Sequence, residues 1–282
     1  MPVIDPAFVF RETSMKPQFI LLGLVAVLGI AAFAYWVLSS DSDPNSNSDS
    51  EGTVPSKGEA LPPRLESLTQ PSSQRPGWKA IENVVPEDRE SLEDVYRREP
   101  SLQNKRQITW ALAMIGDGDT AKLLRGSLLE DYDNQNIPEN AEDVLVDTCL
   151  VLGFLARQDP ETFTFLIEGT KPEFWEDVKT WNSTRGDFGT HKLIASCIQA
   201  IGLSEHPRTQ DELRRLQSMP REYRHEFYGD IVQAAYYASM KRNPEDFERA
   251  FWSKAGLTSF LEWRETPEGA KWKEWAEAQK KI

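Results

Sequence analysis

The sequence predicts an all-α protein that consists of one transmembrane helix, a linker and a domain of stacked helix pairs. Three observations predict this organisation. Residues 19–38 are apolar and uncharged, whereas residues 39–77 are rich in Ser, Pro, Asp, Asn and Gly. In residues 78–282, apolar side chains recur at helical spacing, and no useful stretch alternates as a strand does.

The predicted membrane span has the sequence FILLGLVAVLGIAAFAYWVL. At about 1.5 Å per residue, a helix of this length crosses the hydrocarbon core of a bilayer. A cleaved signal peptide is the alternative, because Ala32-Phe33-Ala34 places small residues at a cleavage position. The apolar run continues to Leu38, beyond the usual length of a signal sequence, which favours an uncleaved signal-anchor.

The charges beside the span predict its orientation. Arg11 and Lys16 precede it, whereas the first basic residue after it is Lys57. Basic flanks stay on the cytoplasmic side of a membrane. We therefore expect residues 1–18 in the cytoplasm and the remainder outside it, in a single-pass protein of the cell (inner) membrane.

Residues 39–77 are predicted to be a disordered linker. They contain few large apolar side chains whose burial would offset the entropy lost on ordering the chain. The linker would hold the following domain away from the bilayer.

Four points in residues 78–282 are predicted to begin the second helix of a pair: Asp119-Thr120, Asp159-Pro160, His206-Pro207 and Asn243-Pro244. Asp or Asn at the N-cap accepts hydrogen bonds from the first turn, and Pro fits the first helical position because it lacks an N–H. Apolar residues at helical spacing lie before and after each point. Each unit is thus a helical hairpin with an apolar side that it cannot bury alone.

The segment ALAMIGDGDTAKLL, from Ala111 to Leu124, resembles a HEAT repeat in its small and apolar first helix, its Gly-Asp turn and its second helix. This resemblance to the armadillo-like family implies a right-handed α-solenoid of about four hairpins. The unequal spacing of the four starts disfavours a tetratricopeptide array, whose period is fixed. Residues 86–98 and 267–282 each begin with Pro and are expected to form helices that cap the stack.

The composition restricts the function. A formal net charge of −13 argues against a nucleic-acid binder, and 3 His and 2 Cys leave little material for a metal cluster. The sequence also lacks the common signatures of metalloproteases, nucleotide-binding loops and serine hydrolases. We therefore expect no enzyme activity, no cofactor, no metal and no small-molecule substrate. The alternative is an envelope hydrolase or lyase on a helical scaffold, with paired carboxylates as acid and base.

Two groups of residues are candidates for specific roles. Aromatic residues in the segment 172–189 form a possible partner-binding patch: Phe174, Trp175, Trp181 and Phe188. Their alternative role is packing over the edge of the solenoid. Cys149 and Cys197 precede their units' second helices by similar distances, so neighbouring helices would place them at similar height. They could form a disulfide in an oxidising compartment or remain buried core thiols.

Together these features predict a membrane-anchored, non-catalytic protein-interaction or scaffolding module. Its acidic domain would stand outside the cytoplasm and bind protein partners that carry basic or polar segments. If the span were cleaved, the same solenoid would be secreted.

Overall fold

A computed structural model of the chain describes residues 61–70, 78–99, 102–129, 141–176, 188–240 and 253–281. All regular secondary structure in these residues is helical, which confirms the predicted all-α class. The chain divides into two units, Met1–Glu51 and Gly52–Ile282, and every described residue belongs to the second. The elements in chain order are η2 (Pro63–Thr69), α2 (Trp78–Ile81), η3 (Pro86–Asp88), α3 (Arg89–Arg98), α4 (Leu102–Ile115), α5 (Gly118–Leu128), α6 (Ala141–Leu155), α7 (Pro160–Glu168), α8 (Pro172–Glu176), α9 (Phe188–Leu203), α10 (Thr209–Gln217), α11 (Arg221–Ser239), α13 (Ser253–Arg264) and α14 (Pro267–Lys280).

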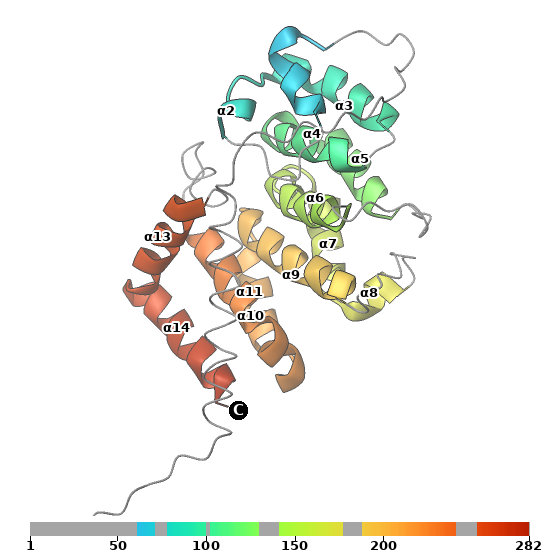
Figure 1. Ribbon diagram of the computed structural model, residues 1–282. Coiled ribbons are helices and arrows are strands. Elements are labelled where there is room, and N and C mark those ends of the chain that lie inside the picture. Colours follow the sequence, from blue (N-terminus) through green and yellow to red (C-terminus); the bar gives the residue numbers. More distant parts are fainter. Residues whose placement is uncertain are drawn as a thin grey trace, which may run out of the picture. The chain divides into compact units, whose positions relative to one another are not determined.

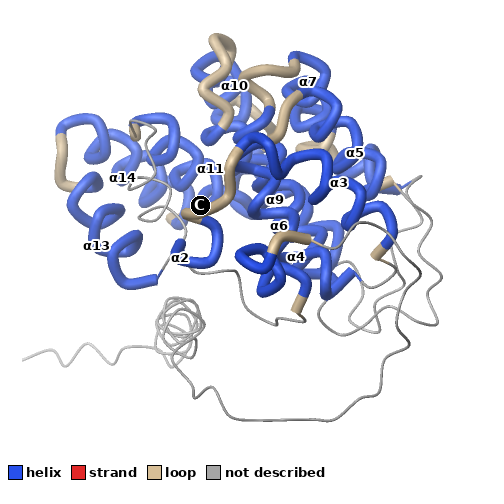
Figure 2. The backbone as a smooth tube through the Cα atoms, turned by 90° about the horizontal axis from the view of Figure 1, so that it is seen from above, coloured by secondary structure: helices blue, strands red, loops and turns tan. Residues whose placement is uncertain are grey.

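The helices of this unit form two layers. Helices α4, α6, α9 and α11 pack side by side in chain order and form what we call the long-helix layer (Figure 1). Helices α5, α7 and α10 lie on one side of the long-helix layer and form what we call the short-helix layer (Figure 2). Helix α14 packs on α11, and η2 packs on α4 at the other end of the layer. The largest fully buried side chains include Trp110, Phe163 and Phe227, so the core runs along the whole stack.

Small residues bring the long helices into close contact. A Cβ atom added at Gly153 of α6 would lie 2.5 Å from the carbonyl oxygen of Ala200 on α9. One at Gly202 of α9 would lie 2.6 Å from the Cα atom of Ala234 on α11. The same contact, a glycine against the backbone of an alanine, thus joins two successive pairs of helices.

Ion pairs join the turns that connect the two layers. Arg125 of α5 lies 3.3 Å from Asp159, which precedes α7, and Arg157 after α6 lies 3.0 Å from Glu205 after α9. Arg89 of α3 likewise pairs with Asp117, which precedes α5. These ion pairs join residues of successive parts of the stack, and partly exposed pairs of this kind contribute little energy.

The predicted starts of the second helices are right at one point and displaced at two. Asp159 caps α7 as predicted, since its side chain accepts a hydrogen bond from the N–H of Glu161 and Pro160 occupies the first position. Helix α5 is capped by Asp117 and begins two residues before Thr120. Helix α10 begins at Thr209, three residues after His206. The fourth start, at Asn243-Pro244, lies outside the described residues.

The helices expected at both ends of the domain are confirmed. Residues 86–98 form η3 and α3, with Pro86 at the first position. Helix α14 begins at Pro267, and the Thr266 hydroxyl caps it by accepting a hydrogen bond from the N–H of Gly269 at 3.1 Å.

The predicted linker is wrong over Pro63–Thr69. This segment is a 3-10 helix whose Leu65 and Leu68 side chains have no exposed surface. Arg64 is anchored to the Asp88 carboxylate of η3. Burial of two leucines against the domain provides the stabilisation that the composition of the segment does not suggest.

The remaining predictions for the N-terminal region concern residues 1–60, which lie outside the described residues. They include the cytoplasmic N-terminus, the transmembrane helix 19–38 and most of the linker. Among the described residues, none of the helices combines the length and apolar composition needed to cross a membrane.

Candidate functional site

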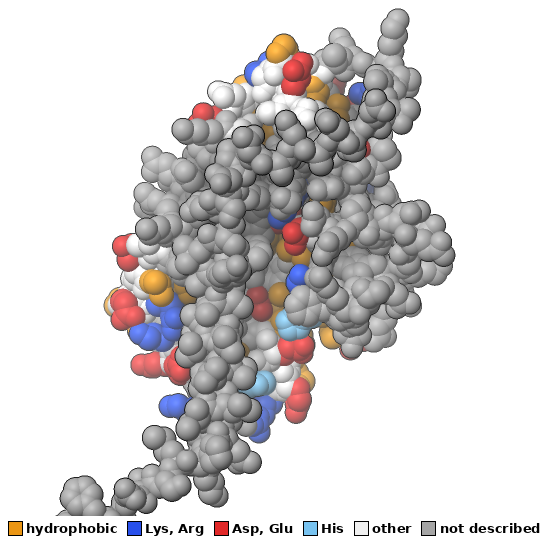
Figure 3. Space-filling view, in the orientation of Figure 1, with side chains coloured by type: hydrophobic (Ala, Val, Ile, Leu, Met, Phe, Trp, Pro, Cys, Tyr) orange, Lys and Arg blue, Asp and Glu red, His pale blue; other side chains and the backbone are white. Residues whose placement is uncertain are grey.

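The long-helix layer has a side that faces away from the short-helix layer, and we call it the open face. It carries half-buried or exposed side chains, most of them three or four residues apart along their helices. They are Asp143, Val146 and Phe154 on α6, Lys192, Ala195 and Gln199 on α9, and Glu222, Glu226, Asp230 and Gln233 on α11. Figure 3 shows acidic, basic, histidine and hydrophobic side chains close together where the described surface is visible. Among the described side chains named here, four are carboxylates and one, Lys192, is basic.

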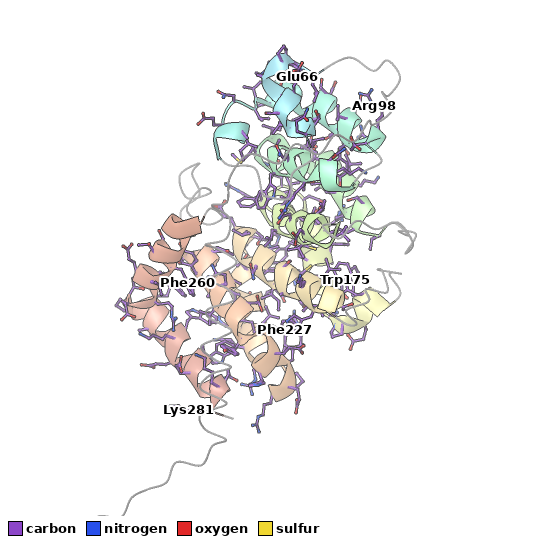
Figure 4. All side chains as sticks on the ribbon, viewed as in Figure 1. Glu66, Arg98, Trp175, Phe227, Phe260 and Lys281 are labelled. Atoms are coloured by element: carbon purple, nitrogen blue, oxygen red, sulfur yellow. The ribbon has the colours of Figure 1, made fainter. Side chains whose placement is uncertain are left out.

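A polar network crosses the contact between α9 and α11. The Nδ1 atom of His191 lies 2.8 Å from Glu226 Oε1. The His191 ring stacks on Phe227, which Figure 4 labels, with ring centres 4.6 Å apart. Further along the two helices, Gln199 Nε2 donates to Asp230 Oδ1 at 2.8 Å. Glu226 and Asp230 are four residues apart on α11, so they lie in one row on the open face.

Asp230 has the most perturbed environment in this network. Burial raises the pKa of its carboxyl group above the ordinary value of 3.8, while the bond from Gln199 and the nearby His191 oppose that rise. The group therefore holds its proton at a higher pH than an exposed aspartate does. Glu226, one turn away, adds a second carboxylate to the same row.

We expect Asp230→Asn to stabilise the folded protein at neutral pH. Because the folded pKa exceeds the unfolded one, ionisation of Asp230 costs stability as the pH rises from 3.8 through the folded pKa. Asparagine removes this cost and keeps an oxygen for the Gln199 bond. Urea unfolding of both proteins across this pH range measures the difference. The gain should disappear at low pH, and a gain that is equal at all pH values would contradict the role of ionisation.

The opposite end of the layer holds a buried ion pair. Asp147 on α6 has no exposed surface and accepts hydrogen bonds from Arg106 Nε at 2.7 Å and from Trp110 Nε1 at 2.9 Å, both on α4. Asp143 lies one turn earlier, 3.6 Å from Arg106, and reaches the open face. Asp147 cannot contact a ligand, so its effect is to hold α4 against α6 and to orient Asp143.

Two of the four aromatic residues predicted as a partner-binding patch belong to the core. Trp175 is buried and donates through Nε1 to the carbonyl oxygen of Gly169 at 2.8 Å (Figure 4). Phe174 is half-buried and packs edge to face on Trp175, with ring centres 5.0 Å apart. The alternative role predicted from the sequence was packing over the edge of the solenoid, and the contacts of these two residues are packing contacts within the chain. Trp181 and the side chain of Phe188, the first residue of α9, lie outside the described residues.

The two cysteines lie together, as the sequence predicted from their spacing. Cys149 on α6 and Cys197 on α9 are both free and fully buried. Burial raises the pKa of the Cys197 thiol well above its ordinary value, and its hydrogen bond with Cys149 raises it further. In this state both residues are reduced side chains within the core.

Two hollows on the surface have volumes of about 460 Å³ each. One lies at the end of α9, where His206 stacks on Phe163 and accepts a hydrogen bond from the N–H of Arg208. Burial and Arg208 lower the pKa of His206, so this ring is neutral near pH 7. The other hollow lies beside α3. Neither is lined by Glu226 or Asp230, and the described part of the chain has no group of three His, Cys, Asp or Glu side chains placed to hold a metal ion.

Sequence reasoning missed the network of α9 and α11. Its partners are far apart in sequence, since His191 and Glu226 differ by 35 positions and Gln199 and Asp230 by 31. The available signal was the spacing of Glu222, Glu226 and Asp230, which places three carboxylates on one side of a helix.

No protein-family model matches this sequence, and neither a curated protein nor a solved structure matches it. The geometry described above therefore carries the functional argument.

Proposed function

We propose that this protein is a membrane-anchored, non-catalytic interaction or scaffolding module that presents a HEAT-like helical-repeat domain outside the cytoplasm. Its binding surface is the open face, and its partners are proteins with basic or polar segments. The observation that carries the proposal is the row of carboxylates on the side of the long-helix layer that the short-helix layer leaves uncovered.

Repeated helix pairs support a binding role. A stack in which each helix pair contacts only its neighbours produces an extended surface, and proteins of this architecture use such surfaces for binding. Here the exposed Glu222 and Glu226 and the half-buried Asp143 and Asp230 give that surface a negative potential. A net charge of −13 for the whole chain acts in the same direction. Complementary charge would raise the rate at which a basic partner associates and would make binding sensitive to salt.

The predicted anchor determines where this face operates. Residues 19–38 supply the apolar length of a bilayer span, and the basic residues before it favour a cytoplasmic N-terminus. Protease added outside the intact inner membrane should digest the domain while the full-length protein fractionates with membranes. A soluble, shortened protein would support cleavage after the span, and a protected domain would contradict the proposed orientation.

A hydrolase or lyase that uses paired carboxylates is the second candidate. The observation that favours it is the raised pKa of Asp230, one helical turn from Glu226 and close to His191. It ranks second because these groups lie on an open surface and not in either hollow, whereas acid–base catalysis requires a site that positions a substrate.

Site-specific photo-crosslinking in cells tests the binding role. A crosslinker at Gln233 on the open face should give a discrete adduct, while one at the exposed Gln210 of α10 should not. We expect Glu222→Gln with Glu226→Gln to weaken the adduct about three- to tenfold at low salt, because exposed charges each contribute modestly. Glu274→Gln on α14 is the matched control. Equal adducts from both positions, or an adduct unaffected by the paired substitutions, would contradict the proposed face.

A further inference from the structure

The contact between α6 and α9 contains two thiols that the proposed binding face does not use. We propose that Cys149 and Cys197 form a disulfide bond that joins the second helix pair covalently to the third. The proposal rests on the extracytoplasmic placement proposed above, because disulfides persist in oxidising compartments and are rare in the cytoplasm.

The first argument is the close approach of the two helices. At Gly153 the contact is so tight that a Cβ atom would lie 2.5 Å from the Ala200 carbonyl oxygen and 2.9 Å from the Ala200 Cα atom. Cys149 lies one turn before Gly153, and Cys197 lies one turn before Ala200. The two cysteines therefore stand at the same level, on the sides of α6 and α9 that face each other. A disulfide needs its two Cβ atoms within about 3.5–4.5 Å, and closely packed helices bring facing side chains into this range.

The second argument is the position of the sulfur atoms. The Cys197 thiol is hydrogen-bonded to Cys149, so the two groups that would react are already in contact. On another side, a Cβ atom at Gly169 after α7 would lie 2.6 Å from Cys197 Sγ. The backbone of a third element thus restricts the sulfur to the neighbourhood of its partner. Both residues have no exposed surface, so a bond once formed would be shielded from soluble reductants.

The oxidant would be a disulfide, either a small molecule or the active site of an exported thiol oxidase. One cysteine thiolate attacks the oxidant disulfide and forms a mixed disulfide, which releases the first oxidant thiol. The second cysteine then attacks this mixed disulfide, forms the Cys149–Cys197 bond and releases the second oxidant thiol, so the two cysteine protons leave with the reduced oxidant. Burial raises the pKa of Cys197, so its thiolate is scarce in the folded protein, and neither cysteine is exposed to an oxidant. The exchange must take place while the chain folds.

Mass spectrometry of the full chain tests the bond. Membranes from expressing cells are dissolved in denaturant that contains an alkylating reagent and no reductant. We expect an intact mass without added alkyl groups, lower by two hydrogen atoms than the mass of the reduced protein. Cys149→Ala should give one alkyl group, because it leaves Cys197 without a partner. Two alkyl groups on the native chain would overturn the presence of the bond in cells.

A second measurement separates the chemistry from the compartment. The reduced full chain is refolded in detergent in a buffer of reduced and oxidised glutathione. If the bond forms there but not in cells, the pairing stands and the extracytoplasmic placement fails. If it forms in neither, the pairing itself is overturned. Once the bond is present, reducing it in denaturant and refolding the chain with reductant should lower the Tm of the native chain, and the same treatment should leave the Tm of the variant with both cysteines replaced by alanine unchanged.

Discussion

Replacing Asp147 by alanine is expected to lower the free energy of unfolding by about 3–5 kcal/mol, the usual cost of breaking a buried ion pair from one side. The substitution removes the carboxylate that lies 2.7 Å from Arg106 Nε, and Arg106 is only 4% exposed. The weaker pair with Asp143, at 3.6 Å, stays in place. The substitution also removes the acceptor of the Trp110 indole N–H. The large effect thus comes from the groups that lose their partner and not from the carboxylate itself.

Removing both charges should cost much less. In the variant with Asp147→Leu and Arg106→Met, apolar side chains of similar size replace the pair, and no buried charge is left behind. Urea unfolding of the full chain in detergent, followed by circular dichroism, measures both variants. Asp211→Ala breaks the exposed pair with Arg214 and serves as the control, with little expected change. If the double variant is as unstable as Asp147→Ala, the ion pair is not the source of the effect.

The elements that could be predicted from the sequence are those with local signals. Asp159-Pro160 supplies its own N-cap and first residue, and α7 begins there. The pair of aspartates around Gly118 shows the limit of this reasoning. Asp117 and Asp119 are both able to cap, and Asp117 caps α5 while also pairing with Arg89, which comes from α3. The local sequence therefore predicts the turn but not which of the two aspartates caps α5. The aspartate that does so is also the one that pairs with a residue distant in sequence.

Burial in Pro63–Thr69 could not be predicted in this way. Leu65 and Leu68 stand in a stretch of Pro, Ser and Glu that resembles a linker. They are buried because η2 packs on α4 and because Arg64 is held by Asp88, contacts that depend on the assembled fold. The only indication in the sequence was the helical spacing of the two leucines. A pattern this short does not distinguish a helical turn that packs on the domain from one that does not.

The candidate site likewise has one part that the sequence could predict and one part that it could not. The carboxylate row of α11 could be predicted, because a spacing of four residues lies within one helix. The contacts of His191 and Gln199 could not, because they need α9 and α11 to pack in one register. Aromatic density was misleading at Trp175, since a large apolar side chain fits a binding patch and a core equally well, and this one is 1% exposed.

The register of the long helices depends on the close contacts at Gly153 and Gly202. Alanine at different glycines of this layer should therefore change the free energy of unfolding in opposite directions. Alanine is preferred over glycine in a helix by about 1 kcal/mol, so Gly229→Ala on α11 is expected to stabilise the protein by roughly that amount. A Cβ atom at Gly229 has nothing within 4 Å. At Gly202 it would lie 2.6 Å from the Cα atom and 2.7 Å from the carbonyl carbon of Ala234, both in the backbone of the next helix.

Gly202→Ala is therefore expected to lower the free energy of unfolding by about 1–3 kcal/mol or more, because a backbone cannot move aside as a flexible side chain can. The added methyl group must push α9 away from α11, which lengthens the Gln199–Asp230 bond and the His191–Glu226 contact. Hydrogen exchange should show faster opening of both helices in Gly202→Ala and no such change in Gly229→Ala. Gly153→Ala, which meets Ala200 in the same way, should behave like Gly202→Ala. Stabilisation at Gly202 would mean that α9 and α11 do not pack in this register, and the carboxylate row would then lose the contacts that position it.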